Sequence, residues 1–195
     1  MTTDSSTSTN LSLLERVSAN ESKAWQSLVN LYRPLVAFWC RRAGVVENQI
    51  DDLIQDVFFS VVRSLDQYQP TRENGSFRAW LWTITRNKII DSARAGKRNP
   101  PARGGSTALH ATREIAEQID PSDETERTQW SHLVHRALAQ VQNEFEEKTY
   151  QAFWRSTIDN VPVAQVAKEL GLGAATIRKY RSRILRRLRQ QLGDS

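Results

Sequence analysis

The chain has 195 residues, 39% hydrophobic and 25% charged, which are values typical of one large or two small globular domains. No apolar run approaches the roughly 20 residues that cross a bilayer, and the first residues lack the basic start and apolar core of a secretory leader. We therefore expect a cytoplasmic protein without membrane insertion, and the single Cys40 fits a reducing compartment.

The net charge of +5 is unevenly distributed along the chain. Residues 171–195 hold seven Lys or Arg and one Asp, a net charge of +6, so the preceding 170 residues sum to −1. A basic excess confined to one predicted helix indicates local contact with a polyanion such as DNA.

The first half of the chain predicts a helical domain. Residues 1–10 are rich in Ser and Thr without periodicity, which predicts a disordered tail. Apolar residues then recur at helical spacing to about residue 43, where Gly44 ends the pattern. A second helix is predicted over about 49–65. Its apolar face includes Val62, and three polar residues share the opposite face at i, i+3 and i+4: Asp52, Gln55 and Asp56.

A polar loop over 66–75 leads to a helix over about 76–95, for which Ser76 is the predicted N-cap. This helix is aromatic in its first half and basic in its second. Phe77 and Trp80 fall on its apolar stripe, which leaves core packing and an exposed role equally open for them. Trp82 falls nearer the polar faces.

The second half of the chain predicts a linker and a second helical domain. Residues 96–108 contain prolines and glycines without apolar periodicity, and the polar stretch that follows extends this predicted linker over 98–124. Four helices are predicted over 125–192, and no segment has a convincing strand pattern. The predicted fold is all-α: two small helical domains, 11–97 and 125–192, joined by a flexible linker.

The pattern over 161–183 is typical of a helix-turn-helix. A short helix with Val166 meets a turn at Gly171, and a second helix packs back through Ile177 and Tyr180. The second helix of such a motif lies in the major groove of DNA. Base contacts are predicted for Ala175, Thr176, Arg178 and Lys179. Phosphate contacts are predicted for Arg183 and Arg186.

Motifs for catalysis or metal binding are missing from the sequence. It has no phosphate-binding glycine loop and no nucleophile motif. His132 and His135 share a helix face without a Cys nearby, which favours surface residues over a metal site. Asp51, Asp52 and Asp56 could serve an acid/base or metal reaction, but carboxylates at a helix start are explained by the helix dipole. We expect no enzyme activity, no cofactor and no metal.

Two runs of sequence resemble a known family. DDLIQDVFFSVVRSL and SFRAWLWTITRNKIIDSAR resemble the second conserved region of the sigma-70 family of RNA polymerase sigma factors, closest to the extracytoplasmic-function (ECF) group. The helix-turn-helix resembles the fourth conserved region. The resemblance covers about 11–97 and 125–192, and it implies an initiation factor that directs core RNA polymerase to promoters and assists melting. The alternative is a stand-alone helix-turn-helix transcription regulator.

The resemblance also implies partners and site residues. Asp52, Gln55 and Asp56 would bind the clamp helices of the polymerase β′ subunit, and the β subunit is a second polymerase partner. The last helix would read the −35 element, and an anti-sigma factor is a further possible partner. The −10 element would be read by residues of the polar loop and the following helix: Asn74, Ser76, Phe77, Trp80, Trp82, Arg86, Asn87 and Arg94.

The sequence departs from the family pattern at two adjacent positions. Many members have an Arg where Tyr180 stands and an apolar residue where Arg181 stands. This departure leaves open which of the two side chains is buried and which is exposed.

Overall fold

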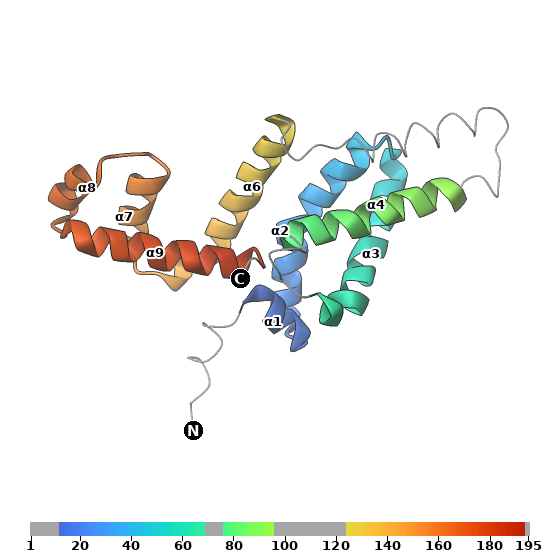
Figure 1. Ribbon diagram of the computed structural model, residues 1–195, viewed down its shortest axis with the longest axis horizontal. Helices are drawn as coiled ribbons and strands as arrows, with labels where there is room; N and C mark the ends of the chain where they lie inside the picture. The colour runs from blue at the N-terminus through green and yellow to red at the C-terminus, as the bar shows by residue number, and fades with distance from the viewer. Residues whose placement is uncertain (1–11, 69–75, 96–123, 194–195) are drawn as a thin grey trace, which may run out of the picture. The chain divides into compact units, whose positions relative to one another are not determined.

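The computed structural model describes residues 12–68, 76–95 and 124–193, and every regular element within these ranges is helical (Figure 1). The predicted all-α fold is thereby confirmed for the described residues. The predicted tail, the loop with Asn74 and the linker before residue 124 lie outside them. The elements are α1 (Leu13–Ser18), α2 (Ser22–Arg42), α3 (Glu47–Ser64), α4 (Phe77–Ala95), α6 (Glu124–Val141), α7 (Glu147–Thr157), α8 (Val163–Leu170) and α9 (Ala174–Gln191), with short 3-10 turns at Leu65–Gln67 and Gln142–Glu144.

The chain packs as two units, of which the first runs from Leu14 to Leu133. Its centre is a bundle in which α2, α3 and α4 all contact one another (Figure 1). Apolar side chains at helical spacing fill this bundle, and Leu28, Leu35, Val57 and Leu81 are completely buried. Burial of such side chains contributes about 1.5–3 kcal/mol each, which is the main source of stability for the bundle.

Two features of the helix ends follow from the sequence. Helix α2 runs through Pro34 as one element and ends at Ala43, followed by Gly44 with a φ of +77°. The predicted stop at Gly44 is confirmed, since glycine adopts this left-handed backbone without a Cβ clash. At the start of α4, the Ser76 side chain accepts a hydrogen bond from the Ala79 amide at 3.4 Å, a long form of the predicted N-cap.

The second unit contains the residues from Val134 onward, and α7 contacts both α8 and α9 there (Figure 1). Ala152, Val166 and Ile177, one from each helix, are fully buried in its core. Helix α8 ends at Gly171, which has a φ of +62° and donates its amide hydrogen to the Ala167 carbonyl. The short α8, the left-handed turn and the long α9 confirm the predicted helix-turn-helix.

Candidate nucleic-acid and partner interfaces

The acidic face of α3 is open to solvent. Asp52, Gln55 and Asp56 are all exposed, because the intervening Leu53 and Val57 turn the opposite face into the core. Asp51 is paired, accepting a hydrogen bond from Arg33 at 2.7 Å. Neither Asp52 nor Asp56 pairs with a cation in the described part of the chain. The three predicted residues therefore lie together and stay available to a partner.

An apolar groove lies beside this acidic face, between α2 and α3. Gln55 is among the residues that line it, and so are Trp25, Val29, Phe58, Phe59 and Val62. Phe59 and Val62 are 56% and 52% exposed, and the Arg63 guanidinium lies 4.3 Å from the centroid of the Phe59 ring. Val62, predicted on the apolar face of the helix, lies at the exposed edge of that face in the groove and not in the core. A cluster of exposed apolar groups next to free carboxylates is typical of a protein-binding surface.

The aromatic residues at the start of α4 divide between core and surface. Phe77 is completely buried, with its ring centroid 5.1 Å from Tyr32 and 5.6 Å from Trp80. Phe77 is thus a core residue and leaves the set of predicted DNA contacts, because a side chain with no exposed surface cannot touch a strand. Trp80 is half-buried, with its ring 5.0 Å from Tyr68.

The remaining predicted residues of α4 reach the surface to different degrees. Trp82 is half-buried and packs on Trp39 with ring centroids 5.2 Å apart. Arg86 is half-buried, and Asn87 and Arg94 are exposed. Arg94 lies 3.8 Å from Asp91, which is a loose contact between two solvated groups. Ser76 is half-buried at the helix start, so these five residues present aromatic, polar and cationic groups along one helix.

Helix α9 separates its core residues from its cations by register. Ile177, Ile184 and Leu188 are buried, whereas the cations on the other faces are exposed: Arg178, Lys179, Arg181, Arg183, Arg186 and Arg189. Ala175 is exposed and Thr176 half-buried at the start of this helix. Tyr180 packs against the core cluster, so at the two positions that depart from the family pattern Tyr180 faces inward and Arg181 outward.

One cation of α9 has a structural role. Arg187 is buried, and its Nε and Nη2 atoms donate to the two carboxylate oxygens of Glu144 at 2.6 and 2.7 Å. In the sequence, Arg187 is one of the seven cations of the helix predicted to contact a polyanion. The bidentate pair between this buried guanidinium and the partly exposed Glu144 instead fixes the rotation of α9 against the turn that precedes α7.

A second ion pair joins α7 to α8. Arg155 of α7 pairs with Glu169 of α8, and Gln165 donates to the same carboxylate at 2.9 Å. The hydrogen bond from Arg155, followed by that from Gln165, lowers the pKa of Glu169 below its usual range. The carboxylate therefore stays ionised at neutral pH and joins the first helix of the motif to the helix beneath it.

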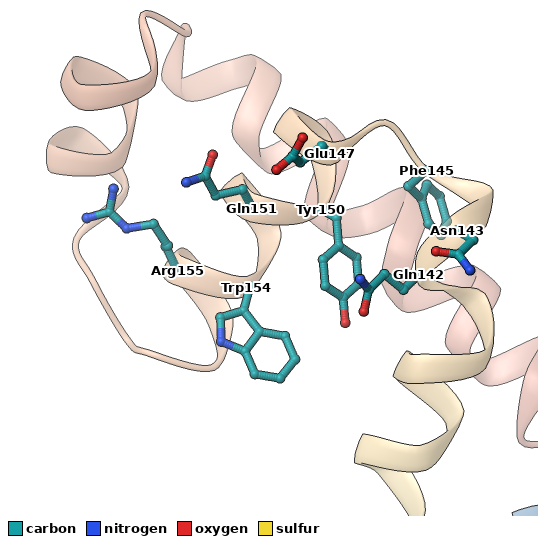
Figure 2. A pocket seen from close by; sticks show the side chains of 8 residues that line it. All are labelled: Gln142, Asn143, Phe145, Glu147, Tyr150, Gln151, Trp154 and Arg155. Carbon is teal, nitrogen blue, oxygen red and sulfur yellow. The ribbon is translucent and has the colours of Figure 1, made fainter.

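A shallow groove crosses the surface of α7 (Figure 2). Figure 2 shows Tyr150 beside Gln142 in the middle of the groove, with Trp154 and Arg155 farther along α7 and Phe145 near Asn143. Burial raises the pKa of Tyr150 above its ordinary value, so its hydroxyl is neutral at neutral pH. The groove combines aromatic walls with polar rims. The sequence pattern predicts a helix through Tyr150 and Trp154 but does not predict this groove.

Within residues 12–68, 76–95 and 124–193, no three His, Cys, Asp or Glu side chains form a group that could hold a metal ion. In the same residues no helix is both long and apolar enough to cross a membrane.

Comparison with known proteins identifies the family. The sigma-70 region 2 family matches residues 28–99, which include α3 and α4. ECF RNA polymerase sigma factor SigL of Mycobacterium tuberculosis is 31% identical, over 74% of this chain and 77% of SigL. ECF RNA polymerase sigma-E factor of Haemophilus influenzae is 25% identical, over 91% of this chain and 90% of that protein.

A third relative matches a shorter stretch. RNA polymerase sigma factor CnrH of Cupriavidus metallidurans is 33% identical over 40% of each chain. The match of the region 2 family to α3 and α4 disfavours the alternative of a stand-alone helix-turn-helix regulator, which has no use for that region. Fold and relatives agree, and the chain belongs to the ECF group of the sigma-70 family of RNA polymerase sigma factors, which direct core RNA polymerase to promoters.

Proposed function

We propose that the two units of this ECF sigma factor divide promoter recognition between them. The first unit binds core polymerase through the acidic face of α3 and the opened −10 strand through α4 and the loop before it. The second unit binds the −35 element through α9. The protein acts in the cytoplasm and supplies positioning and strand capture, with no catalysis of its own.

The proposed contact with core polymerase rests mainly on two exposed acidic side chains of α3. Asp52 and Asp56 are exposed and pair with no described cation, although Asp51, the residue directly before Asp52, is paired. An unpaired acidic face suits a basic partner surface, and the adjacent groove with Phe59 and Val62 supplies apolar area. We assign this combined surface to the clamp helices of the β′ subunit.

The proposal for the −10 element rests on chemistry along α4. An unpaired DNA strand is bound by aromatic stacking surfaces and by cations along its backbone. Trp80 and Trp82 offer partly exposed rings, and Arg86 and Arg94 offer charge. Ser76 and Asn87 supply hydrogen-bonding groups that can read a base edge, and Asn74 remains a prediction from the sequence alone.

The proposal for the −35 element rests on the order of residues along α9. Ala175, Thr176, Arg178 and Lys179 lie at the N-terminal end, which in a helix-turn-helix points toward base edges. Arg183 and Arg186 lie one to two turns farther on, where the helix runs beside the phosphates. Their exposure supports both assignments.

The α7 groove in Figure 2 fits an apolar helix with polar flanks, and we assign it to the β subunit of polymerase. An anti-sigma factor would act by covering this groove or the one between α2 and α3, since either contact would compete with polymerase.

Run-off transcription with core polymerase on genomic fragments tests the proposal. The full-length protein is expected to produce specific starts, and Asp52→Arg with Asp56→Arg is expected to abolish them together with holoenzyme formation. Asp159→Arg, a reversal at an exposed carboxylate of the other unit, serves as the control. Holoenzyme formation that survives the double reversal would remove the proposed role of α3.

A further inference from the structure

The start of α6 carries a buried carboxylate in the first unit. Glu126 is 1% exposed, and its two oxygens accept hydrogen bonds from Trp39 of α2 at 2.9 Å and from the Nη2 atom of Arg78 of α4. Burial of a charged group is costly unless it is paired, so these two contacts hold the first turns of α6 on the bundle. Nothing in the local sequence pattern around Glu126 predicts its partners.

Aromatic rings surround the cation of this pair. The guanidinium carbon of Arg78 lies 5.9 Å from the Trp39 ring centroid and 5.7 Å from that of Trp130, a residue of α6 that is 37% exposed. Trp39 also packs on Trp82. We call Trp39, Arg78, Trp82, Glu126 and Trp130 the Arg78 cluster. It joins α6 to residues beside the face of α4 that is proposed to hold the −10 strand.

The ion pair of the cluster is incompletely matched. Arg78 reaches Glu126 through Nη2, and its buried Nε has no hydrogen-bond partner in the described part of the chain. A buried ion pair adds little net stability, because desolvation offsets the attraction between the charges. A contact of this kind can therefore be exchanged for a better-matched ligand at low cost.

The chemistry of the cluster specifies that ligand. An Arg fork binds phosphate through two parallel hydrogen bonds, and its plane stacks on aromatic rings and bases. Trp rings are the usual stacking surface for single-stranded nucleic acid. In the cluster, the Glu126 carboxylate occupies the position of an anion against Arg78, and the Trp130 ring lies where a base could stack on the guanidinium.

We propose that Arg78, Trp39 and Trp82 form a nucleotide subsite for the opened strand, and that Glu126 and Trp130 cap this subsite in the free protein. The inference rests on the proposed function of α4, and it adds a site and a mechanism to it. Binding of a nucleotide displaces the first turns of α6. One phosphate then pairs with both the Nε and the Nη2 donors of Arg78. The cap lowers the affinity of free sigma factor for single strands.

The test measures binding of a fluorescently labelled oligothymidine strand to the full-length protein. Glu126→Gln keeps the shape of the side chain but removes the competing charge. Affinity is expected to rise about tenfold, as for loss of one competing charge-assisted hydrogen bond. The salt dependence is expected to steepen by about 0.7, the contribution of one added phosphate contact on a single strand. Glu146→Gln, at an exposed acid of the other unit, is the matched control.

The rise in strand affinity caused by Glu126→Gln must depend on Arg78. Adding Arg78→Gln to Glu126→Gln is expected to return affinity and salt slope to the wild-type values or below. An unchanged or lower affinity of a folded Glu126→Gln protein would overturn the subsite. If that variant does not fold, Trp130→Ala removes the other half of the cap, and it must raise affinity in the same direction for the subsite to stand.

Arg94→Gln separates this inference from the proposed function of α4. If Arg94→Gln weakens strand binding while Glu126→Gln and Trp130→Ala change nothing, the subsite is wrong and the role of α4 stands. If none of these variants changes binding, both are wrong.

Discussion

The two units each contain an Arg–Glu pair between distant residues, and the two pairs differ in geometry. Arg187 meets both oxygens of Glu144 through two donors, whereas Arg78 meets Glu126 through one donor; each guanidinium also has one buried nitrogen, Nη1 of Arg187 and Nε of Arg78, without a partner in the described chain. The first geometry fixes one rotation of α9, and the second permits exchange with an outside anion. Similar residues thus hold the helix proposed to read DNA in one unit and form the contact proposed to be releasable in the other.

The units also differ in how they share residues between stability and recognition. Along α9, helical register assigns Ile177 and Ile184 to the core and Arg178 and Lys179 to solvent. Along α4, Trp80 and Trp82 are half-buried, so they pack in the first unit and are also proposed to bind the DNA strand. Recognition can therefore be altered without loss of stability more easily on α9 than on α4.

The largest expected effect concerns the rigid pair. Arg187→Met removes both hydrogen bonds to the partly exposed Glu144 carboxylate, and the free energy of unfolding is expected to fall by about 2 kcal/mol. Chemical denaturation of the full-length protein measures this change. Arg189→Met, an exposed neighbour on the same helix, should change stability by less than about 0.5 kcal/mol. Equal effects of the two variants would contradict the distinction between a structural and a solvated cation.

The next largest expected effect concerns the proposed binding of the −35 element by α9. Arg178→Ala is expected to weaken binding of the holoenzyme to its −35 element by about ten- to hundredfold, the range for one base-reading side chain, with unfolding unchanged. Tyr180→Phe keeps the ring in the core cluster and should leave affinity intact. Promoter binding of both holoenzymes is compared on the duplex identified by run-off transcription. A loss of affinity in Tyr180→Phe alone would reverse the assignment of the buried and exposed positions.

A smaller effect is expected for the releasable pair. Arg78→Gln should reduce the global stability by less than about 1 kcal/mol, because the first turns of α6 can detach and let Glu126 reach water. Amide hydrogen exchange over residues 125–130 should accelerate, while exchange in α2 and α3 stays slow. A global loss as large as that of Arg187→Met would show that the contact is a fixed part of the core.

The smallest effect at neutral pH concerns Cys40. Burial raises the pKa of its thiol to about 12, so the thiol stays protonated and should react with maleimide only on unfolding. The unfolded chain loses this proton near pH 9, before the folded chain does. The stability that the neutral thiol contributes is therefore present below pH 9 and lost as the pH rises toward 12. Cys40→Ala should make the alkaline loss of stability shallower, and an unchanged slope would contradict a buried neutral thiol.

Much of the helix-turn-helix could be predicted because its signals are local. The spacing of Val166, Ile177 and Tyr180 fixes which faces meet, and a glycine at the turn fixes the reversal. The exposed set of Asp52, Gln55 and Asp56 follows in the same way from the period of α3. Such inferences need only the neighbours within a few turns of helix.

The burial and pairing of other side chains could not be predicted, because they depend on tertiary partners that no local pattern encodes. Phe77 and Trp80 fall on the same apolar stripe in sequence, but only Phe77 is completely buried, with its ring against Tyr32, Tyr68 and Trp80. Arg187 counts as one more cation until Glu144, which is 43 residues away, is found beside it. Glu126 looks like any acid of a helix start, although its partners lie 48 and 87 residues earlier in the chain.

Gly171 has a consequence for the handedness of the turn in the helix-turn-helix. Its φ of +62° belongs to the region that mirror-image amino acids prefer, and a Cβ built there meets no atom within 4 Å. An L-alanine at this position would therefore suffer only backbone strain, of about 1 kcal/mol. A D-alanine introduced by chemical ligation would adopt this φ without that strain and would restrict the unfolded chain. The turn is thus a site where inverted chirality should stabilise a natural fold.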